Sequence, residues 1–366
     1  MMSLNGEGSR AIKEVLGAIK VASPHEFDFA GRSFAVHGVG HQHGGHQHAG
    51  HQHGGHQHGG HQHAGHAAPD PHAEAFVATL SAYLYEYAYS RPFVGRLPEP
   101  ATLDLSIDAG LLEALSMANT TRDRWEHGWT IAQILQHGQI SAQKGSLRRN
   151  LWPGQFLSKD GPASVPRPGA EISVFYARES RSLQSGFYYA FGEEAEEVSD
   201  GLGLVRLYWN VSFEGAPRLV GLVTSRLNRF RVPFRVKFAT ARSQFERTDV
   251  SVVYLAKRFF RIAAELMLDV HPEIEDALGD EVPLFSKRLA KGLGVAEDPG
   301  TGESFGQSRC HRLAESVWSC YLRGEQTTEA RWDEFGRLLK QSGLDPHHTH
   351  LNSGSLDWYE LPPEVA

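Results

Sequence analysis

The chain has 366 residues, of which 40% are hydrophobic and 22% charged, an ordinary composition for a soluble globular protein. Its formal net charge of -7 gives it no general affinity for nucleic acid, and no apolar run reaches the length of a membrane span. The N-terminus lacks the layout of a secretory signal, and the two cysteines, Cys310 and Cys320, cannot form a disulfide framework. We therefore expect a cytoplasmic protein with reduced thiols.

The N-terminal part combines a helix signal with a repeat. Apolar residues recur at helical spacing over residues 8–22, which predicts a short helix within an N-terminal extension, residues 1–40. From His41 to His66 a five-residue unit of the type HQHGG occurs five times, without hydrophobic periodicity. Such a glycine-rich tract predicts a disordered linker over residues 41–69. Its histidines can bind nickel, copper or zinc weakly, so metal storage is an alternative to simple repeat expansion in a tolerant linker.

The remaining chain predicts a domain over residues 70–342, followed by a loose tail, residues 343–366. Helical spacing predicts helices near residues 76–87, 111–117, 129–140, 259–267 and 304–321, with a glycine-rich loop over 283–307. Short runs rich in aromatic and β-branched residues predict strands near residues 172–177, 186–191, 205–213, 232–238 and 249–254. Because helices and strands are segregated along the chain, we expect an α+β fold: a helical N-terminal part, a mostly antiparallel sheet in the middle and C-terminal helices.

One segment of the chain is strongly basic, although the chain as a whole has a negative net charge. Between Arg226 and Arg261 lie ten basic residues and two acidic ones. Within it, apolar residues alternate with Arg231, Arg235 and Lys237, which predicts a strand with one apolar and one cationic face. Arginine offers a bidentate fork and lysine a mobile point charge, so such a face suits a phosphate or a carboxylate. A solvated strand face with no ligand is the alternative.

Familiar catalytic templates are missing from the sequence. It contains no G-x-x-x-x-G-K-[ST] phosphate loop, no G-x-S-x-G elbow, no H-E-x-x-H and no C-x-x-C pair. A reaction on a phosphorylated substrate that needs neither metal nor cofactor fits the cations better. β-Elimination of phosphate requires a base for the Cα proton and cations for the departing phosphate, and an acid can assist.

Candidate residues for this chemistry follow from the predicted strands. Lys237 is the candidate base, because like-charged neighbours favour the neutral amine that accepts a proton. His311 is a candidate acid, although a lone histidine on a helix is more often structural. The candidate phosphate-binding residues are Arg235, Arg206, Arg247, Arg178 and Arg309, and the candidate supporting residues are Tyr208, Asn210 and Asp249.

Six segments carry a resemblance to a known family: FYARES, SGFYYAFG, VRLYWNV, SRLNRFRVPFRVKF, FERTDVSVVYL and GLGVAEDPGTGESFGQSRC. They resemble the HopA family, and the likeness spans about residues 75–325. Plant-pathogen type III effectors gave this family its name, and relatives lie in bacterial gene clusters for modified peptides, including class V lanthipeptides and thioamide-containing peptides.

In those clusters the resemblance implies a lyase that removes phosphate from serine or threonine of a precursor peptide, leaving dehydroalanine or dehydrobutyrine. A separate Ser/Thr kinase-like protein would supply the phosphorylated peptide. The role of Lys237 rests on chemistry and on analogy with phosphothreonine lyases, which use lysine, histidine and arginine.

Two other functions stay open. An effector-like protein would bind host or partner proteins without catalysis. A nucleic-acid binder would use the patch from Arg226 to Arg261, but no recognised nucleic-acid module supports it. We therefore expect a phosphorylated precursor peptide and a kinase-like protein as partners, with neither nucleic acid nor membrane.

Overall fold

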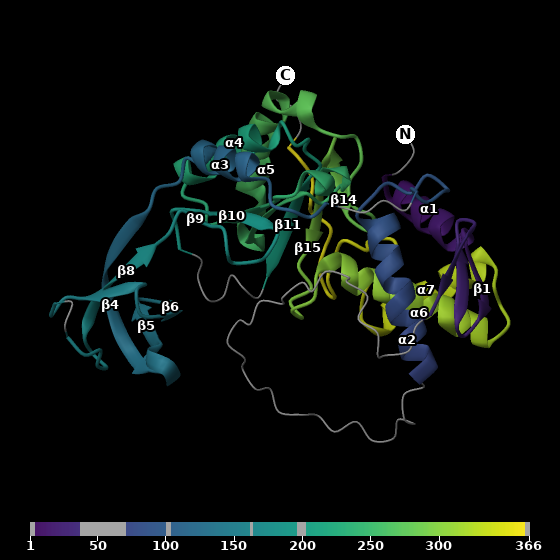
Figure 1. Ribbon diagram of the computed structural model, residues 1–366, viewed down its shortest axis with the longest axis horizontal. Helices are drawn as coiled ribbons and strands as arrows, with labels where there is room; N and C mark the ends of the chain where they lie inside the picture. Colours follow the sequence, from purple (N-terminus) through teal and green to yellow (C-terminus); the bar gives the residue numbers. More distant parts are fainter. Residues whose placement is uncertain (1–3, 37–70, 100–103, 162–163, 196–202, 363–366) are drawn as a thin grey trace.

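The computed structural model describes residues 4–36, 71–99, 104–161, 164–195 and 203–362. The predicted linker, residues 41–69, lies outside these ranges. Within them the strands form three antiparallel sheets, and helices pack on both faces of the largest sheet (Figure 1). The predicted α+β fold is confirmed.

The helices lie mainly before and after the strands of the largest sheet. They are α1 Leu4–Gly17, α2 Pro71–Leu84, α3 Ala109–Ala118, α4 Ala216–Arg229, α5 Phe260–Val270, α6 Phe305–Leu322 and α7 Thr328–Gln341. A π-helical turn, η1 Tyr85–Tyr89, extends α2, and short 3-10 turns are η2 Gln136–Gly138, η4 Arg242–Glu246, η5 Lys257–Phe259, η6 His271–Glu273 and η7 Glu275–Ala277. In the described ranges, none of the helices has both the length and the apolar character that crossing a membrane requires.

The largest sheet has seven strands in the order β14-β15-β11-β13-β12-β10-β9. Their bounds are β9 Glu179–Ser180, β10 Phe187–Phe191, β11 Leu204–Trp209, β12 Arg235–Ala239, β13 Ser251–Ala256, β14 Lys287–Ala290 and β15 Leu293–Glu297. Alternate residues point to opposite faces, so one set joins a core with α3, α4 and α5 while the other faces α2 and α6. The sheet thus lies between two helical layers (Figure 1).

A five-stranded sheet projects away from these layers (Figure 1). Its strands are β4 Arg124–Ile134, β5 Ile140–Lys144, β6 Leu147–Leu151, β7 Phe156–Ser158 and β8 Glu171–Tyr176, in the order β6-β5-β4-β8-β7. The prediction of a helix over residues 129–140 is wrong, because Trp129 and Ile131 alternate with outward residues and are buried in this sheet. A turn at Gln136–Gly138, with positive φ at His137 and Gly138, then reverses the chain.

The N-terminal residues also differ from the prediction. The helix expected over residues 8–22 ends at Gly17, and a small sheet follows, made of β1 Ile19–Ser23, β2 Glu26–Phe29 and β3 Arg32–Ala35. Arg331 of α7 is buried and attaches the end of α1 and the start of β1 to α7. Its Nη1 donates to the carbonyl oxygens of Leu16 at 2.9 Å and Ile19 at 2.6 Å. These residues share one hydrophobic core with α2 and α6.

The C-terminal part holds more structure than its glycines suggest. The loop predicted over residues 283–307 contains the hairpin of β14 and β15, whose turn places Gly292 at a φ of +62°. The tail predicted to be loose from residue 343 contains buried residues, among them Leu351 and Tyr359. Tyr359 is buried and donates to Glu297 Oε1 at 2.6 Å, so one buried acceptor anchors the segment to β15.

Candidate functional site

The strand that the sequence predicts to have a cationic face is β12. Val236 and Phe238 are buried in the core with α3, α4 and α5, while Arg235 and Lys237 lie on the opposite face and are half-buried. The prediction of one apolar and one cationic face is confirmed for Arg235 and Lys237, whereas Arg231 lies before the strand, in a turn with a φ of +56°. Arg235 and Lys237 therefore lie outside the core formed with α3, α4 and α5, on the sheet face that α2 and α6 partly cover.

Neighbouring strands extend this cationic face into a row. Arg206 of β11 pairs in register with Tyr254 of β13, and Tyr254 pairs in register with Arg235 of β12. Side chains in such a row lie about 5 Å apart at Cβ. The guanidinium carbons of Arg206 and Arg235 lie 5.4 and 5.0 Å from the centre of the Tyr254 ring, and Lys237 Nζ lies 5.9 Å from it. We call these four residues the cation–tyrosine cluster.

The cations of the cluster differ in their partners. Arg206 is 9% exposed and donates from Nε and Nη2 to Asp298 Oδ2, at 2.8 and 2.5 Å. Among the described residues, Lys237 has no carboxylate at ion-pair distance, and its Nζ lies over the Phe187 ring at 4.4 Å from the centre. Lys237 therefore keeps its charge available for an anion, whereas much of the charge of Arg206 is balanced.

The cations around Tyr254 lower the pKa of its phenol. Burial alone raises the pKa of its phenol, but Lys237, Arg206 and Arg235 outweigh burial and hold the pKa below its usual value. Burial dominates at Tyr208, where it raises the pKa to about 12, and at Tyr189, where the pKa is also raised. Tyr254 is thus unlike the two tyrosines nearest to it.

A second polar group borders the cluster through Tyr208, which is buried on the same face. Arg247 holds Asp249 with two hydrogen bonds of 2.8 and 2.9 Å, and its Nη2 also donates to Tyr85 Oη at 3.1 Å. The carboxylate of Asp249 neutralises the guanidinium, and both groups are largely buried. We therefore assign Arg247 and Asp249 to the support of the site and not to direct phosphate binding.

Two predicted phosphate-binding arginines lie elsewhere. Arg178 Nη2 donates to Ser116 of α3 at 3.0 Å and stands beside Glu179, which accepts from Tyr188 on the opposite face of the sheet. Arg309 is 2% exposed and donates to the carbonyl oxygens of Thr349 and Leu351 at 2.9 and 3.0 Å. Its hydrogen bonds hold the C-terminal segment, so the structure does not bring either arginine to Lys237.

His311 and Asn210 also lie apart from the cluster. His311 is on the exposed side of α6, where its Nε2 is 3.5 Å from Glu315 Oε1, and the hydrogen bond with Glu315 raises the pKa of the histidine. Asn210 follows β11 and its Nδ2 donates to the carbonyl oxygen of Glu281 at 2.9 Å. In the structure His311 therefore does not contact Lys237, and Asn210 holds the loop that contains Glu281.

Sequence reasoning missed Tyr254 as a member of the site. The alternating pattern of residues 249–254 predicted a strand, but it did not say which strand would lie beside it. Only the register between β12 and β13 places Tyr254 next to Arg235. A strand with a cationic face followed at hairpin distance by a strand containing a tyrosine was the available signal.

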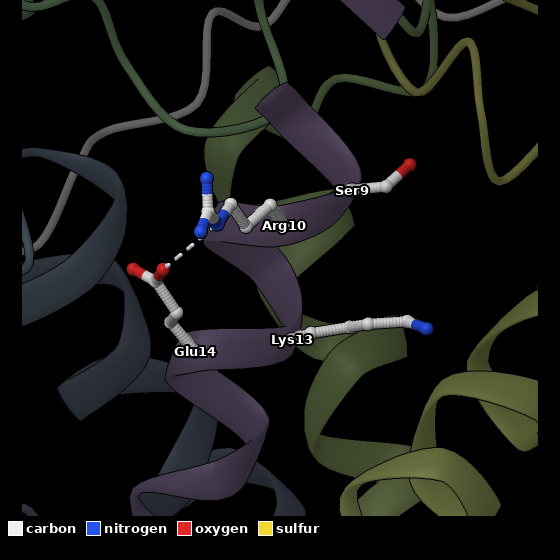
Figure 2. A pocket seen from close by; sticks show the side chains of 4 residues that line it. All are labelled: Ser9, Arg10, Lys13 and Glu14. Atoms are coloured by element: carbon white, nitrogen blue, oxygen red, sulfur yellow. Dashed lines mark ion pairs between the residues drawn. The ribbon is translucent and has the colours of Figure 1, made fainter. Parts of the chain in front are cut away.

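A hollow on the surface of α1 offers no comparable chemistry. Its lining side chains are Ser9, Arg10, Lys13 and Glu14, and Figure 2 shows them along one helix. Arg10 and Glu14 form an exposed pair at 3.7 Å, four residues apart, which is usual for a solvated helix. We therefore place the candidate site at the cation–tyrosine cluster.

One protein family matches part of the chain. Residues 178–351 match the model of the HopA1 effector protein family, a span of just under half the chain that contains the whole seven-stranded sheet. No curated protein matches the chain.

Two solved structures are similar to the chain at a low level. An effector protein from Pseudomonas syringae pv. tomato strain DC3000 is 15% identical, with a TM-score of 0.39, over 77% of this chain and 96% of the other. An effector protein from Pseudomonas syringae pv. syringae strain 61 is 14% identical, with a TM-score of 0.41, over 77% of this chain and 97% of the other. At these scores the likeness decides neither fold nor function.

Proposed function

We propose that the protein is a lyase that eliminates phosphate from phosphoserine or phosphothreonine of a precursor peptide. The observation that carries the proposal is the cation–tyrosine cluster. It sets Arg235 and Lys237 side by side on one sheet face, next to a phenol whose pKa is lowered. Cations in a half-buried position suit a phosphate anion better than they suit a neutral substrate.

In this proposal the cationic face holds the phosphate while a base removes the Cα proton. The electron pair of the Cα–H bond becomes the Cα=Cβ double bond, and the Cβ–O bond breaks with its pair remaining on the phosphate oxygen. Dehydroalanine or dehydrobutyrine stays in the peptide. The developing charge on the phosphate is stabilised by Arg235 and Lys237, which removes the need for a metal ion or a cofactor.

Lys237 remains essential to the proposal, as the sequence predicts. It has the charge and the position to serve proton transfer, phosphate binding or both. His311 has no role in the proposed reaction, because it faces solvent and Glu315 on α6. Arg206 lies beside the Tyr254 ring and forms an ion pair with Asp298.

The partners in this proposal are the phosphorylated precursor peptide and a separate Ser/Thr kinase-like protein, acting in the cytoplasm. The direct test incubates the protein with synthetic phosphoserine and phosphothreonine peptides and follows their mass. Elimination removes phosphoric acid and leaves a product lighter by one water than the dephosphorylated peptide. A peptide that keeps its phosphate, or loses it by hydrolysis, contradicts the proposal.

A second function is favoured by the family match alone, since the matching family is named for effectors. An effector-like protein would bind a partner without changing it. Retention of a phosphopeptide with no loss of phosphoric acid over long incubation would support binding without catalysis. Loss of phosphoric acid would exclude that reading.

A further inference from the structure

Tyr254 has a place in the sheet that packing alone does not require. It is 7% exposed and lies in register between arginines on the two neighbouring strands, with Lys237 on the diagonal. A phenylalanine could make the same ring contacts with both guanidinium groups. The hydroxyl is therefore the part of Tyr254 that calls for a separate explanation.

The groups around Tyr254 come from three strands and one loop. They are Arg206 and Tyr208 of β11, Arg235 and Lys237 of β12, Tyr189 of β10, and Asp298, which reaches the cluster through Arg206. Among these described groups Arg206, Arg235 and Lys237 are positively charged, and the carboxylate of Asp298 is bound to Arg206. The local field therefore favours an anion at the phenol oxygen.

We propose that Tyr254 is a catalytic residue of this site and that its phenol oxygen takes the Cα proton in the elimination. This inference rests on the proposed function and gives Lys237 a different task from the one that the sequence suggests. Lys237 would remain an ammonium group that stabilises the phenolate and hydrogen-bonds the departing phosphate oxygen.

The distribution of charge explains why the phenolate is the better acceptor. A phenolate beside an ammonium group keeps a Coulomb attraction that a neutral phenol beside a neutral amine lacks. Arg206 and Arg235 add to that attraction from either side of the ring. An ammonium form of Lys237 also binds phosphate, whereas a neutral amine would not.

The proposed step is balanced without another reactant. The Cα–H bond breaks and the Tyr254 Oη–H bond forms, while the Cβ–O bond breaks and a monoanionic phosphate ester leaves as hydrogen phosphate dianion. Arrival of the negative phosphate offsets the cationic field and so raises the proton affinity of the phenolate. The proton is then lost to water, which restores the phenolate for the next substrate.

The first experiment measures the ionisation of Tyr254 without substrate. The near-ultraviolet absorbance of tyrosinate is followed as the pH of the full-length protein is raised. We expect one tyrosine to ionise below the others, and the Tyr254→Phe protein to lack that early step. Tyr188→Phe is the matched control, because Tyr188 lies on the opposite face with a raised pKa and its removal leaves the early step in place. Absence of the early step from the unaltered protein overturns the inference.

The second experiment separates Tyr254 from Lys237 as the proton acceptor. Tyr254→Phe keeps the ring and should lower the rate of elimination by a factor of about 100 or more. Lys237→Arg keeps the charge but cannot accept a proton, so its loss of rate should be much smaller than that of Tyr254→Phe. An active Tyr254→Phe protein together with an inactive Lys237→Arg protein would assign the base to Lys237 and sink the inference.

The two proposals fail in different ways. If the unaltered protein eliminates phosphate and the Tyr254→Phe protein does so equally well, only the inference about Tyr254 fails. If the unaltered protein converts none of the phosphopeptides, the proposed function itself fails. Circular dichroism and thermal melting of each variant confirm that it is folded before its rate is compared.

Discussion

The two faces of the seven-stranded sheet consist of alternate residues from the same strands, yet they serve different purposes. One face carries Val205, Leu207, Val236 and Val253 into a core closed by three helices. The other carries the cation–tyrosine cluster at the border of the core that α2 and α6 close. Polar and charged groups cost free energy when they are buried, so their concentration on one face points to use and not to packing.

The largest effect expected on the cationic face comes from Lys237→Met. The substitution keeps the length of the side chain and removes the charge next to Tyr254. Elimination should fall by a factor of about 100 or more, because the proton acceptor is lost or is no longer held ionised. The rate with a saturating phosphopeptide, read by mass spectrometry, is the measurement, and a near-normal rate would remove Lys237 from the site.

The largest effect expected on stability comes from Arg309 of α6. Arg309→Met leaves the buried carbonyl oxygens of Thr349 and Leu351 without their donors. We expect a loss of about 3 kcal/mol in the free energy of unfolding, measured by denaturant titration. If Arg309 instead bound phosphate, the variant would keep its stability and lose affinity for the substrate.

Arg235→Met should change binding more than turnover. Arg235 offers a guanidinium fork to the phosphate, but the phenol and the ammonium group remain in place without it. We expect KM to rise by a factor of about 10 and kcat to fall less, which full kinetic curves with one phosphothreonine peptide will show. An equal fall of kcat and kcat/KM would mean that Arg235 acts mainly in the transition state.

The matched change across the sheet is Arg178→Met. Arg178 contacts Ser116 and Glu179 on the side of α3, so its removal should leave both kinetic constants unchanged within a factor of about 2. The kinetic curves used for Arg235→Met provide the comparison. A rise in KM as large as that of Arg235→Met would show that phosphate binding is not confined to one face.

The smallest effect is expected from removal of residues 41–69. The repeat has no apolar periodicity, so its loss should leave the melting temperature and the elimination rate unchanged within error. Only retention on nickel resin should disappear. A melting temperature lower by several degrees would show that the tract packs on the folded protein.

The sequence predicted β10, β11, β12 and β13 of the central sheet because their alternation is local, but it missed β9, β14 and β15. Residues 232–238 show one apolar face and one cationic face without knowledge of any neighbour. The helix predicted at 129–140 failed because short apolar runs fit either structure, and Trp129 and Ile131 find their partners on β5 and β8.

The candidate site was predictable only in part for the same reason. Lys237 and Arg235 share one strand, so their common face follows from spacing. The choice of Tyr254 over Arg178 or Arg309 depends on which strands pair and on which helix covers them. Distant contacts of that kind leave no periodic pattern in a single sequence.

Elimination by the unaltered protein is the measurement that tests the central claim most directly. A phosphothreonine peptide is incubated with the full chain, with and without EDTA, and its mass is followed with time. The account predicts loss of phosphoric acid at the same rate in both samples, since cations of the sheet take the place of a metal. A peptide that remains phosphorylated, or that yields only the free hydroxyl, would contradict it, and activity abolished by EDTA and restored by one divalent ion would contradict its metal-free form.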